Sequence, residues 1–417
     1  MAGFKRTHEP TLRLNLSSST SWAISSGGAT LSTASVTLPD GATSATRMKT
    51  VSTSGGAIAL RYSPGAAVNW FVAGRTIDFD IFIETPIVST TGFAGTFFLS
   101  NDSGFANYFQ ADYLLRPGWN RVRLSRADFS VAAGTPSWDT DMARVQFSIA
   151  ATASQITTAY FSNLRTGGWS RPQVCIMFDD GWESVIDTAK ALMDSYGIPG
   201  TVAVVEDFVG DAGYMTSAEL TTLHNAGWGM VNHSWKHGEG ASSAPWLASS
   251  SVADCQTQIE HCRDYLISLG FTRDNEHLIY CSPFGEFTEN YLTAAANAGC
   301  TFFRGTMGTN VSQLSYPTLG DEWLINPSGV LRPWPCLAGT NTWTSANMIT
   351  HMDRNLAAGR STIILFHSIV TTASAGLEWS TANFTAFLQY LHRKRGLVDF
   401  VTLPEMVRNL RNAGAAA

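Results

Sequence analysis

Two adjacent aspartates, Asp179 and Asp180, follow the apolar run 174–178 and precede Gly181. At the end of a buried strand, neighbouring carboxylates repel each other, so one of them has a raised pKa or meets a cation. A solvated turn that caps a helix would use the same three residues, because Asp accepts backbone N–H groups and Gly permits a positive φ. The pair therefore indicates either a metal or acid–base site or a simple turn.

Two histidines, His233 and His237, stand four residues apart in the stretch HSWKH. This spacing predicts that both imidazoles lie on one side of a helical turn, and Ser234 would cap or steady that turn. Two histidines, one carboxylate and a water suit a catalytic zinc-like site that keeps one position open. A pair of surface histidines is the alternative for this spacing taken alone.

The elements that would position these residues follow from apolar runs that alternate with helical stretches after residue 170. We expect strands at 174–178, 201–205, 229–232, 277–280, 301–303, 362–366 and 399–403, and helices within 182–197, 217–227, 255–270 and 288–299. This pattern predicts a distorted (β/α)7 barrel, in which functional groups gather at the carboxyl ends of the strands. The polar residues at those ends are Asp179, Asp180, His233, His237, Arg304 and His367.

Residues 11–168 differ in texture, being rich in Ser, Thr and Gly with short β-branched and aromatic runs, which is typical of an all-β fold. We predict a β-sandwich of jelly-roll type. The stretches RPGWNRVRLSRADFS, MARVQFSI and TAYFSNLR resemble the last strands of carbohydrate-binding jelly-roll modules. Aromatic residues such as Trp70, Tyr108 and Trp119 would either stack on sugar rings or fill the core. A spacer or oligomerisation sandwich that binds no sugar is the alternative.

Length and composition narrow the class of protein. At 417 residues the chain exceeds the size at which one hydrophobic core stops growing, so two domains are expected. A net charge of −6 without a basic cluster disfavours nucleic acid or an anionic membrane as the main partner. The sequence has no apolar window long enough for a transmembrane helix and no apolar signal-peptide core near residue 1. Six cysteines without a CxxC pair predict reduced, mostly buried thiols.

Four short motifs carry a resemblance to a known family. MFDDG, HSWKH, SPFG and LFH occur in this order, each at a predicted strand end, and residues of about 170–410 resemble the polysaccharide deacetylase (NodB-homology) family of metal-dependent carbohydrate esterases. The resemblance implies one divalent metal ion, expected to be zinc, with the ligands Asp180, His233 and His237.

The same resemblance implies the catalytic roles. Asp179 would be the general base and His367 the general acid. The backbone N–H of Phe284, after Pro283, would stabilise the oxyanion, and Leu365 would form one wall of the acetyl pocket. The two neighbouring aspartates would then have separate roles, since one binds the cation and the other accepts a proton.

One position departs from the family pattern. The third motif usually begins with an Arg two residues before the Pro, where this chain has Cys281. That Arg would orient the base carboxylate. Arg304 ends the next predicted strand, and its side chain would reach Asp179 across one inter-strand spacing of about 5 Å. A surface or ion-pair role for Arg304 is the alternative, and the stretch GDEWLINPSG, with Asp321 and Trp323, is a candidate for the fourth motif.

These observations predict a metal-dependent hydrolase that removes acetyl groups from a polysaccharide. An O-acetyl esterase, another amide hydrolase with the same site, and a glycan-binding adhesin with an inactive barrel are the alternatives. The expected parts are a tail at 1–10, a carbohydrate-binding-like sandwich at 11–168 and the barrel at 169–417. Without a signal peptide, a phage tail enzyme acting on bacterial surface glycan is expected, in the virion or outside the cell, with the cytoplasm as the alternative. Nucleic acid and membrane insertion are not expected, and a homo-oligomer is left open.

Overall fold

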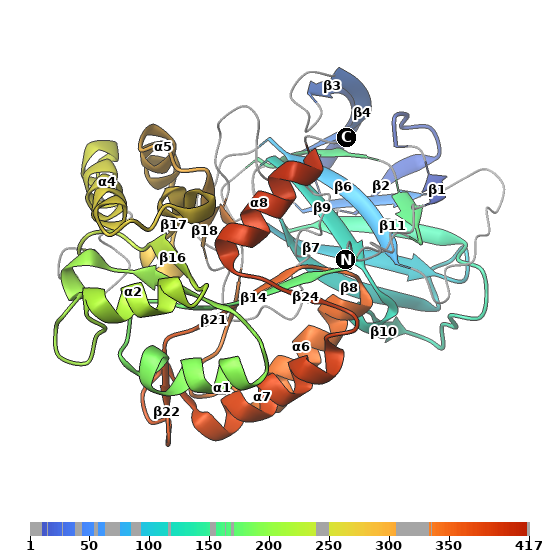
Figure 1. The fold of residues 1–417 in the computed structure, drawn as a ribbon. Helices are drawn as coiled ribbons and strands as arrows, with labels where there is room; N and C mark the ends of the chain where they lie inside the picture. Colours follow the sequence, from blue (N-terminus) through green and yellow to red (C-terminus); the bar gives the residue numbers. More distant parts are fainter. Residues whose placement is uncertain are drawn as a thin grey trace. The chain divides into compact units, whose positions relative to one another are not determined.

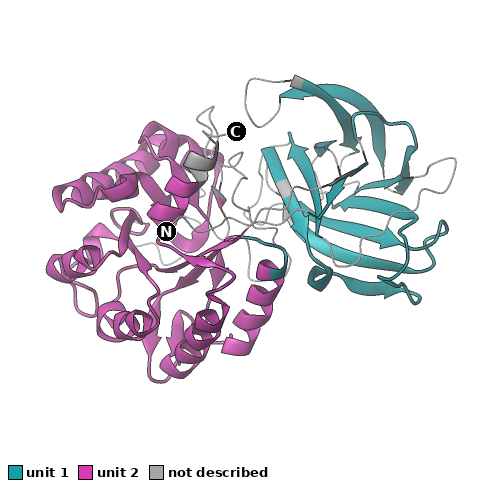
Figure 2. Cartoon of the chain, turned by 45° about the vertical axis from the view of Figure 1, so that its right-hand side comes forward, with its two compact units in different colours: residues 1–170, 310–318, 357–360 teal, residues 171–309, 319–356, 361–417 magenta. Residues whose placement is uncertain are grey.

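The computed structural model describes residues 11–14, 16–26, 28–37, 44–53, 57–62, 76–84, 93–115, 118–150, 156–162, 164–167, 171–238, 250–305, 333–334 and 336–414. The chain divides into two compact units near residue 170, with the short segment 357–360 counted in the first unit (Figure 2). None of the described helices has both the length and the apolar character needed to cross a membrane.

The first unit consists of two antiparallel sheets (Figure 1). One has the strand order β1-β13-β6-β12-β4-β3, with β9 paired to β6, and the other has the order β10-β8-β7-β11-β5-β2. The strands are β1 Thr11–Leu14, β2 Trp22–Ser26, β3 Ala29–Thr37, β4 Ser44–Ser52, β5 Ile58–Tyr62, β6 Ile77–Ile83, β7 Phe93–Ser100, β8 Tyr108–Leu115, β9 Gly118–Leu124, β10 Ser130–Ala133, β11 Arg144–Ile149, β12 Thr158–Phe161 and β13 Leu164–Thr166.

Side chains from both sheets meet in one hydrophobic core. Alternate residues of β7 are buried, as expected for a strand with one face on a core. Phe79 of β6 lies 5.0 Å from Phe97 of β7 and 4.9 Å from Phe147 of β11, measured between ring centroids. The assignment of this unit as a jelly-roll sandwich of the carbohydrate-binding type stays a prediction.

The aromatic residues proposed for sugar stacking have different surroundings. Trp119 is buried beside Val36 and Tyr160, and its indole N–H donates to the Thr37 carbonyl oxygen at 3.0 Å, so it fills a small core. Tyr108 is half-buried. Trp70 lies outside the described residues.

The second unit is built on a parallel sheet with the strand order β19-β18-β17-β16-β15-β14-β21-β20. Its strands are β14 Gln173–Phe178, β15 Gly200–Val204, β16 Gly229–Asn232, β17 Ile279–Cys281, β18 Phe302–Arg304, β19 Pro333–Trp334, β20 Leu337–Ala338, β21 Thr362–Phe366 and β24 Asp399–Phe400; β22 Ser368–Val370 pairs separately with β23 Glu378–Ser380. The helices are α1 Lys190–Ser195, α2 Ser217–Asn225, α4 Val252–Ser268, α5 Glu289–Asn297, α6 Ser345–Ala357, α7 Thr381–Lys394 and α8 Leu403–Gly414, and α4 and α5 pack side by side (Figure 1).

Both faces of the parallel sheet are covered, which explains why its strands read as continuous apolar runs. In β14, Cys175 and Met177 contribute to an interior core, whereas the ring of Phe178 contacts Trp228 and Phe384 on the other face. The strands at 229–232 and 362–366 have the predicted bounds.

A distorted (β/α)7 barrel was predicted, and the described strands form a half-barrel parallel sheet of this type. The run 399–403 gives only a two-residue strand, β24, which pairs with the start of β14. Thr402 then accepts the Glu405 backbone N–H at 3.3 Å, and helix α8 begins at Leu403 with Pro404 in its first turn, where Pro is tolerated. Two short strands, β19 and β20, were not predicted; among the described strands no pairing joins them to each other.

All six cysteines are buried and free, as predicted. Cys255 and Cys262 both lie on α4. Burial raises the pKa of the Cys175 thiol to about 12, so it is protonated at neutral pH.

Candidate active site

The loop after β14 presents the two aspartates. Asp180 and Gly181 both adopt left-handed backbone conformations, with φ of 73° and 83°, which turn the chain sharply at the end of the strand. The Asp180 side chain accepts a hydrogen bond from the Trp182 indole N–H at 3.1 Å through Oδ2. Its other oxygen, Oδ1, is buried and has no hydrogen-bond partner. One carboxylate oxygen is thus held and the other is left for a cation.

The loop after β16 presents the two histidines, but not as a helical turn. Ser234 and His237 have positive φ values of 74° and 49°, so the predicted helical geometry is wrong. The Ser234 N–H donates to Asn232 Oδ1 at 2.9 Å, and Ser234 Oγ accepts the His237 N–H at 3.0 Å. These local bonds compete successfully with helix formation, and Ser234 does steady the turn. The two imidazoles still meet, with 4.9 Å between ring centroids.

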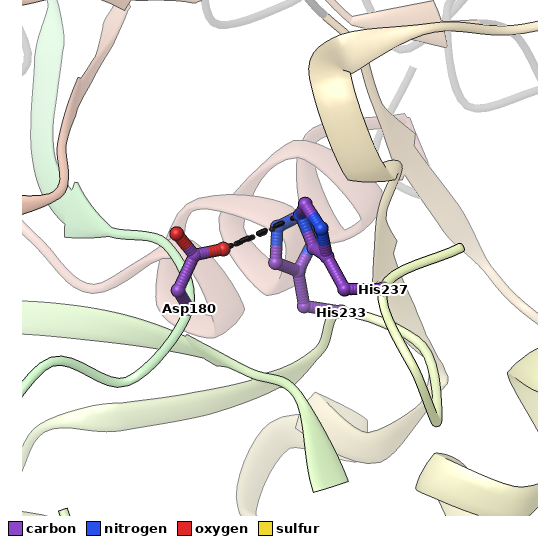
Figure 3. Close-up of side chains that lie close together, drawn as sticks. All are labelled: Asp180, His233 and His237. Atoms are coloured by element: carbon purple, nitrogen blue, oxygen red, sulfur yellow. Dashed lines mark ion pairs between the residues drawn. The ribbon is translucent and has the colours of Figure 1, made fainter. Parts of the chain in front are cut away.

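Asp180, His233 and His237 form a candidate metal site, because their ligand atoms all lie within 4.8 Å of one another. Figure 3 shows the three side chains pointing toward one another. Asp180 Oδ1 lies 3.4 Å from His233 Nε2 and 3.3 Å from His237 Nε2. These separations match the edge of a tetrahedron with metal–ligand bonds of about 2.0–2.1 Å, so the donor set fits zinc-like coordination.

The hydrogen bonding of His233 supports this fit. Its Nδ1–H donates to the Cys281 carbonyl oxygen at 2.7 Å, which leaves Nε2 as the ring nitrogen that faces Asp180. Either a proton or a metal cation then lies between Nε2 and the carboxylate. A carbonyl acceptor on the far ring nitrogen is the usual support of a metal-binding imidazole.

Burial and neighbouring charges shift the pKa values of Asp180, His233 and His237 in different directions. Burial alone would raise the pKa of Asp180, but the neighbouring His233, followed by His367 and His237, holds it well below its ordinary value. Burial would lower the pKa of His233, but the charges of Asp179 and Asp180 raise it. The pKa of His237 falls to about 4, first through burial and then through the charge of His233. Asp180 is therefore ionised and His237 neutral at pH 7, as metal ligands must be.

Asp179 pairs with Arg304, as predicted, but not across the single inter-strand spacing expected, because β15, β16 and β17 stand between β14 and β18 in the sheet. Arg304 ends β18, which pairs with β17, and its Nη2 lies 2.6 Å from Asp179 Oδ2. Both side chains are almost completely buried, and Asp179 Oδ1 has no hydrogen-bond partner. Cys281 is directly beside Arg304 in the register and is buried with it. The buried cation thus holds one oxygen of the carboxylate and leaves the other available.

The remaining predicted residues lie at neighbouring strand ends. His367 follows β21 directly and is half-buried, with its Nδ1 buried and without a partner. Leu365, one residue before the end of β21, is part of the interior core. Pro283 and Phe284 begin a 3₁₀ turn after β17. The exposed ring of Phe284 lies 4.7 Å from the His237 ring.

Several residues of the site were not predicted. Trp182 and Asn232 hold the metal-site loops through the bonds described above, and a Trp directly after the Asp-Asp-Gly turn was the signal available. Tyr214 stacks on Trp182 at 4.5 Å between ring centroids. Asp321 and Trp323, candidates for the fourth motif, lie outside the described residues.

The described parallel sheet carries a carboxylate and two histidines at its strand ends, a donor set that fits a divalent metal ion. Residues 167–303 match the family model described as polysaccharide deacetylase, so the chain carries a polysaccharide deacetylase domain in this region. No curated protein is significantly similar to the chain.

The chain is also similar to solved structures of deacetylases and carbohydrate esterases. The chain is 19% identical to a deacetylase of Streptococcus pyogenes in complex with acetate, covering 32% of this chain and 55% of that one, with a TM-score of 0.28. It is 15% identical to a family 4 carbohydrate esterase from Streptomyces lividans, covering 56% and 94%, with a TM-score of 0.36. It is 20% identical to a family 4 acetyl xylan esterase from Clostridium thermocellum in complex with a cobalt ion. That match covers 56% of this chain and 89% of that one, with a TM-score of 0.36.

Proposed function

We propose that the chain is a metal-dependent deacetylase that removes acetyl groups from a polysaccharide. The single observation that carries this proposal is the buried, unpartnered Asp180 Oδ1, which faces the Nε2 atoms of His233 and His237 at 3.4 and 3.3 Å. We propose zinc as the ion, because one carboxylate and two imidazoles form a borderline-soft ligand set. When bound, the ion polarises the acetyl carbonyl and lowers the pKa of a water beside it.

Asp179 acts as the general base in this proposal. Arg304 fixes its Oδ2 at 2.6 Å, so Oδ1, which is buried without a partner, is the atom that accepts the proton of the attacking water. The two aspartates therefore have separate roles although they are adjacent in the chain.

His367 acts as the general acid. Its Nδ1 is buried, so Nε2 is the ring nitrogen left to protonate the departing nitrogen or oxygen. Expulsion of an amide nitrogen without a proton is prohibitive, so this transfer is essential for an N-acetyl substrate. The backbone N–H of Phe284, after Pro283, donates to the oxyanion, and Leu365 borders the acetyl methyl group.

Metal analysis tests the proposal directly. The purified protein should contain about one equivalent of zinc per chain. Removal of the ion by a chelator should abolish acetate release from acetylated glycans, and added zinc should restore it. His261→Ala is the control, because this exposed histidine pairs with Glu206 and should leave metal content unchanged. Full activity in metal-free protein would contradict the proposal.

The acetyl linkage separates the closest alternatives. O-acetyl esterase activity and hydrolysis of another amide would use the same groups, so acetate release should be measured on N-acetylated and O-acetylated glycans side by side. An adhesin with an inactive barrel would release no acetate from any of them while still binding glycan.

We further propose that residues 11–168 are a carbohydrate-binding-like sandwich and residues 169–417 the catalytic domain. We propose that these two domains together form a phage tail enzyme that acts on bacterial surface glycan. Support for it comes from the Ser/Thr/Gly-rich first unit and the neutral, polar substrate that the composition favours.

Residues 169–417 alone should cleave small acetylated substrates at a rate close to that of the whole chain, because every proposed catalytic group follows residue 174. Acetate release and circular dichroism of this fragment provide the measurement. A folded but inert fragment would mean that the first unit completes the site, and an insoluble one that it shields apolar surface.

A further inference from the structure

A row of aromatic rings lies beside the candidate metal site and joins its two loops. Trp182 stacks on Tyr214 at 4.5 Å, and Tyr214 lies 4.8 Å from Phe208, measured between ring centroids. Phe208 is in turn 5.9 Å from the ring of His237. We call Trp182, Phe208 and Tyr214 the aromatic platform.

Backbone bonds hold the platform in place. Residues 182 and 214 form an isolated β-bridge, reinforced by Glu183 N–H to the Gly213 carbonyl and Met215 N–H to the Gly181 carbonyl, both at 2.9 Å. On its other side, the Asp207 N–H donates to the Trp235 carbonyl at 2.9 Å, in the loop of the two histidines. The platform is therefore fixed to both metal-site loops before any ligand arrives.

The platform is not part of the core. Its three side chains are half-buried, whereas the aromatic residues behind the sheet, such as Phe178, Phe366 and Phe384, are fully buried. Partly exposed rings beside a catalytic site have an apolar face available for a ligand. The apolar C–H face of a pyranose ring suits such a surface, and the hydroxyl of a Tyr or the N–H of a Trp supplies a polar edge.

We propose that the aromatic platform binds the sugar unit next to the one that carries the acetyl group. This inference rests on the proposed deacetylase function and extends it to a second saccharide position. Trp182 has an additional task, because its indole N–H donates to Asp180 Oδ2 at 3.1 Å. Trp182 is therefore a positioning residue for a metal ligand as well as one end of the platform.

Binding measurements test the platform apart from catalysis. Metal-loaded protein carrying Asp179→Asn, so that ligand is not consumed, is titrated calorimetrically with chitopentaose and with acetylated xylopentaose. Phe208→Ala and Tyr214→Ala should each weaken the Kd for the bound oligosaccharide about tenfold. Tyr214→Phe, which keeps the ring, should retain most of the affinity. Tyr196→Ala is the matched control, since this half-buried tyrosine stands just before β15, at the opposite end of the strands, and should change nothing.

Small substrates provide the second readout. In the chain with Asp179 intact, the same platform variants should lose about tenfold in kcat/KM on the acetylated oligosaccharide and clearly less on 4-nitrophenyl acetate, with metal content measured alongside. If the parent chain releases no acetate from any substrate, the deacetylase function is contradicted and the platform is not. Unchanged oligosaccharide affinity in both alanine variants, or no binding of either oligosaccharide by the parent, would overturn the platform.

Trp182→Phe separates the two tasks of Trp182. The Phe ring keeps the stacking surface but cannot donate to Asp180, so zinc affinity measured by competition with a chromophoric chelator should fall at least about tenfold. Oligosaccharide affinity at saturating zinc should be retained. Unchanged zinc affinity would show that the indole N–H does not position the ligand.

Discussion

Asp179→Asn is expected to keep the metal ion and to lose about a thousandfold of the turnover rate. The amide is nearly the same size and can still accept a hydrogen bond from Arg304, but it cannot take a proton from water. His237→Ala should instead lose both metal and activity, because the removed Nε2 lies 3.3 Å from Asp180 Oδ1 in the ligand set. Metal content by elemental analysis and acetate release together make the measurement.

Asp211→Asn is the matched control for this pair, since Asp211 is an exposed carboxylate in a neighbouring loop and should behave as the parent. Equal metal loss in Asp179→Asn and His237→Ala would contradict the division of roles between the two adjacent aspartates. It would mean that Asp179 is itself a ligand.

Arg304→Ala should lower the turnover rate at least about tenfold with metal content unchanged. The reason is that Asp179 would lose the hydrogen bond that Arg304 Nη2 donates at 2.6 Å, and its carboxylate would rotate more freely. Breaking a buried ion pair leaves an uncompensated charge and costs about 3–5 kcal/mol of folding free energy, so thermal unfolding of the variant must be measured alongside.

Cys281→Arg in the Arg304→Ala background makes this test specific. The new guanidinium would start from the neighbouring strand and approach the same carboxylate, so part of the turnover rate should return. A purely structural role for Arg304 predicts recovery of stability without recovery of rate. Arg408→Ala, which removes an exposed arginine paired with Asp274, is the control and should leave both unchanged.

Sequence reasoning located most of the site because its residues follow buried strands directly. Asp179, Arg304 and His367 each follow or end an apolar run. The pairing of Arg304 with Asp179 was predicted, but the expected reach across one inter-strand spacing was wrong, since three strands separate β18 from β14. Such positions depend on the sheet, and the sheet is determined by continuous apolar runs that are visible in the sequence.

Loops were harder to predict because short-range bonds decide them. The spacing of His233 and His237 suggested a helical turn, yet the Asn232 and Ser234 side chains bind backbone N–H groups and stabilise a left-handed path instead. The stacking of Tyr214 on Trp182 joins residues more than thirty positions apart, and no periodicity in either segment indicates it.

The end of the sheet shows a different limit. The run 399–403 looks like a single strand in hydrophobicity, but Thr402 and Pro404 begin a helix within it. An apolar run of this length does not distinguish a strand from the start of a buried helix. Only the residues that favour a helix start, Thr402 and Pro404, indicated that the strand ends early.

The distribution of thiols gives the second unit a built-in reporter of its own opening. All six cysteines lie between residues 175 and 336, all are buried, and the first 174 residues contain none. A thiol-specific reagent therefore modifies the chain only when the half-barrel opens, and it is blind to melting of the two antiparallel sheets. Labelling rates followed with increasing denaturant would separate the unfolding of the two units without any engineered probe. The folded unit presents no accessible thiol to oxidise. In an oxidising medium, disulfide-linked chains would therefore come only from molecules in which this unit has unfolded.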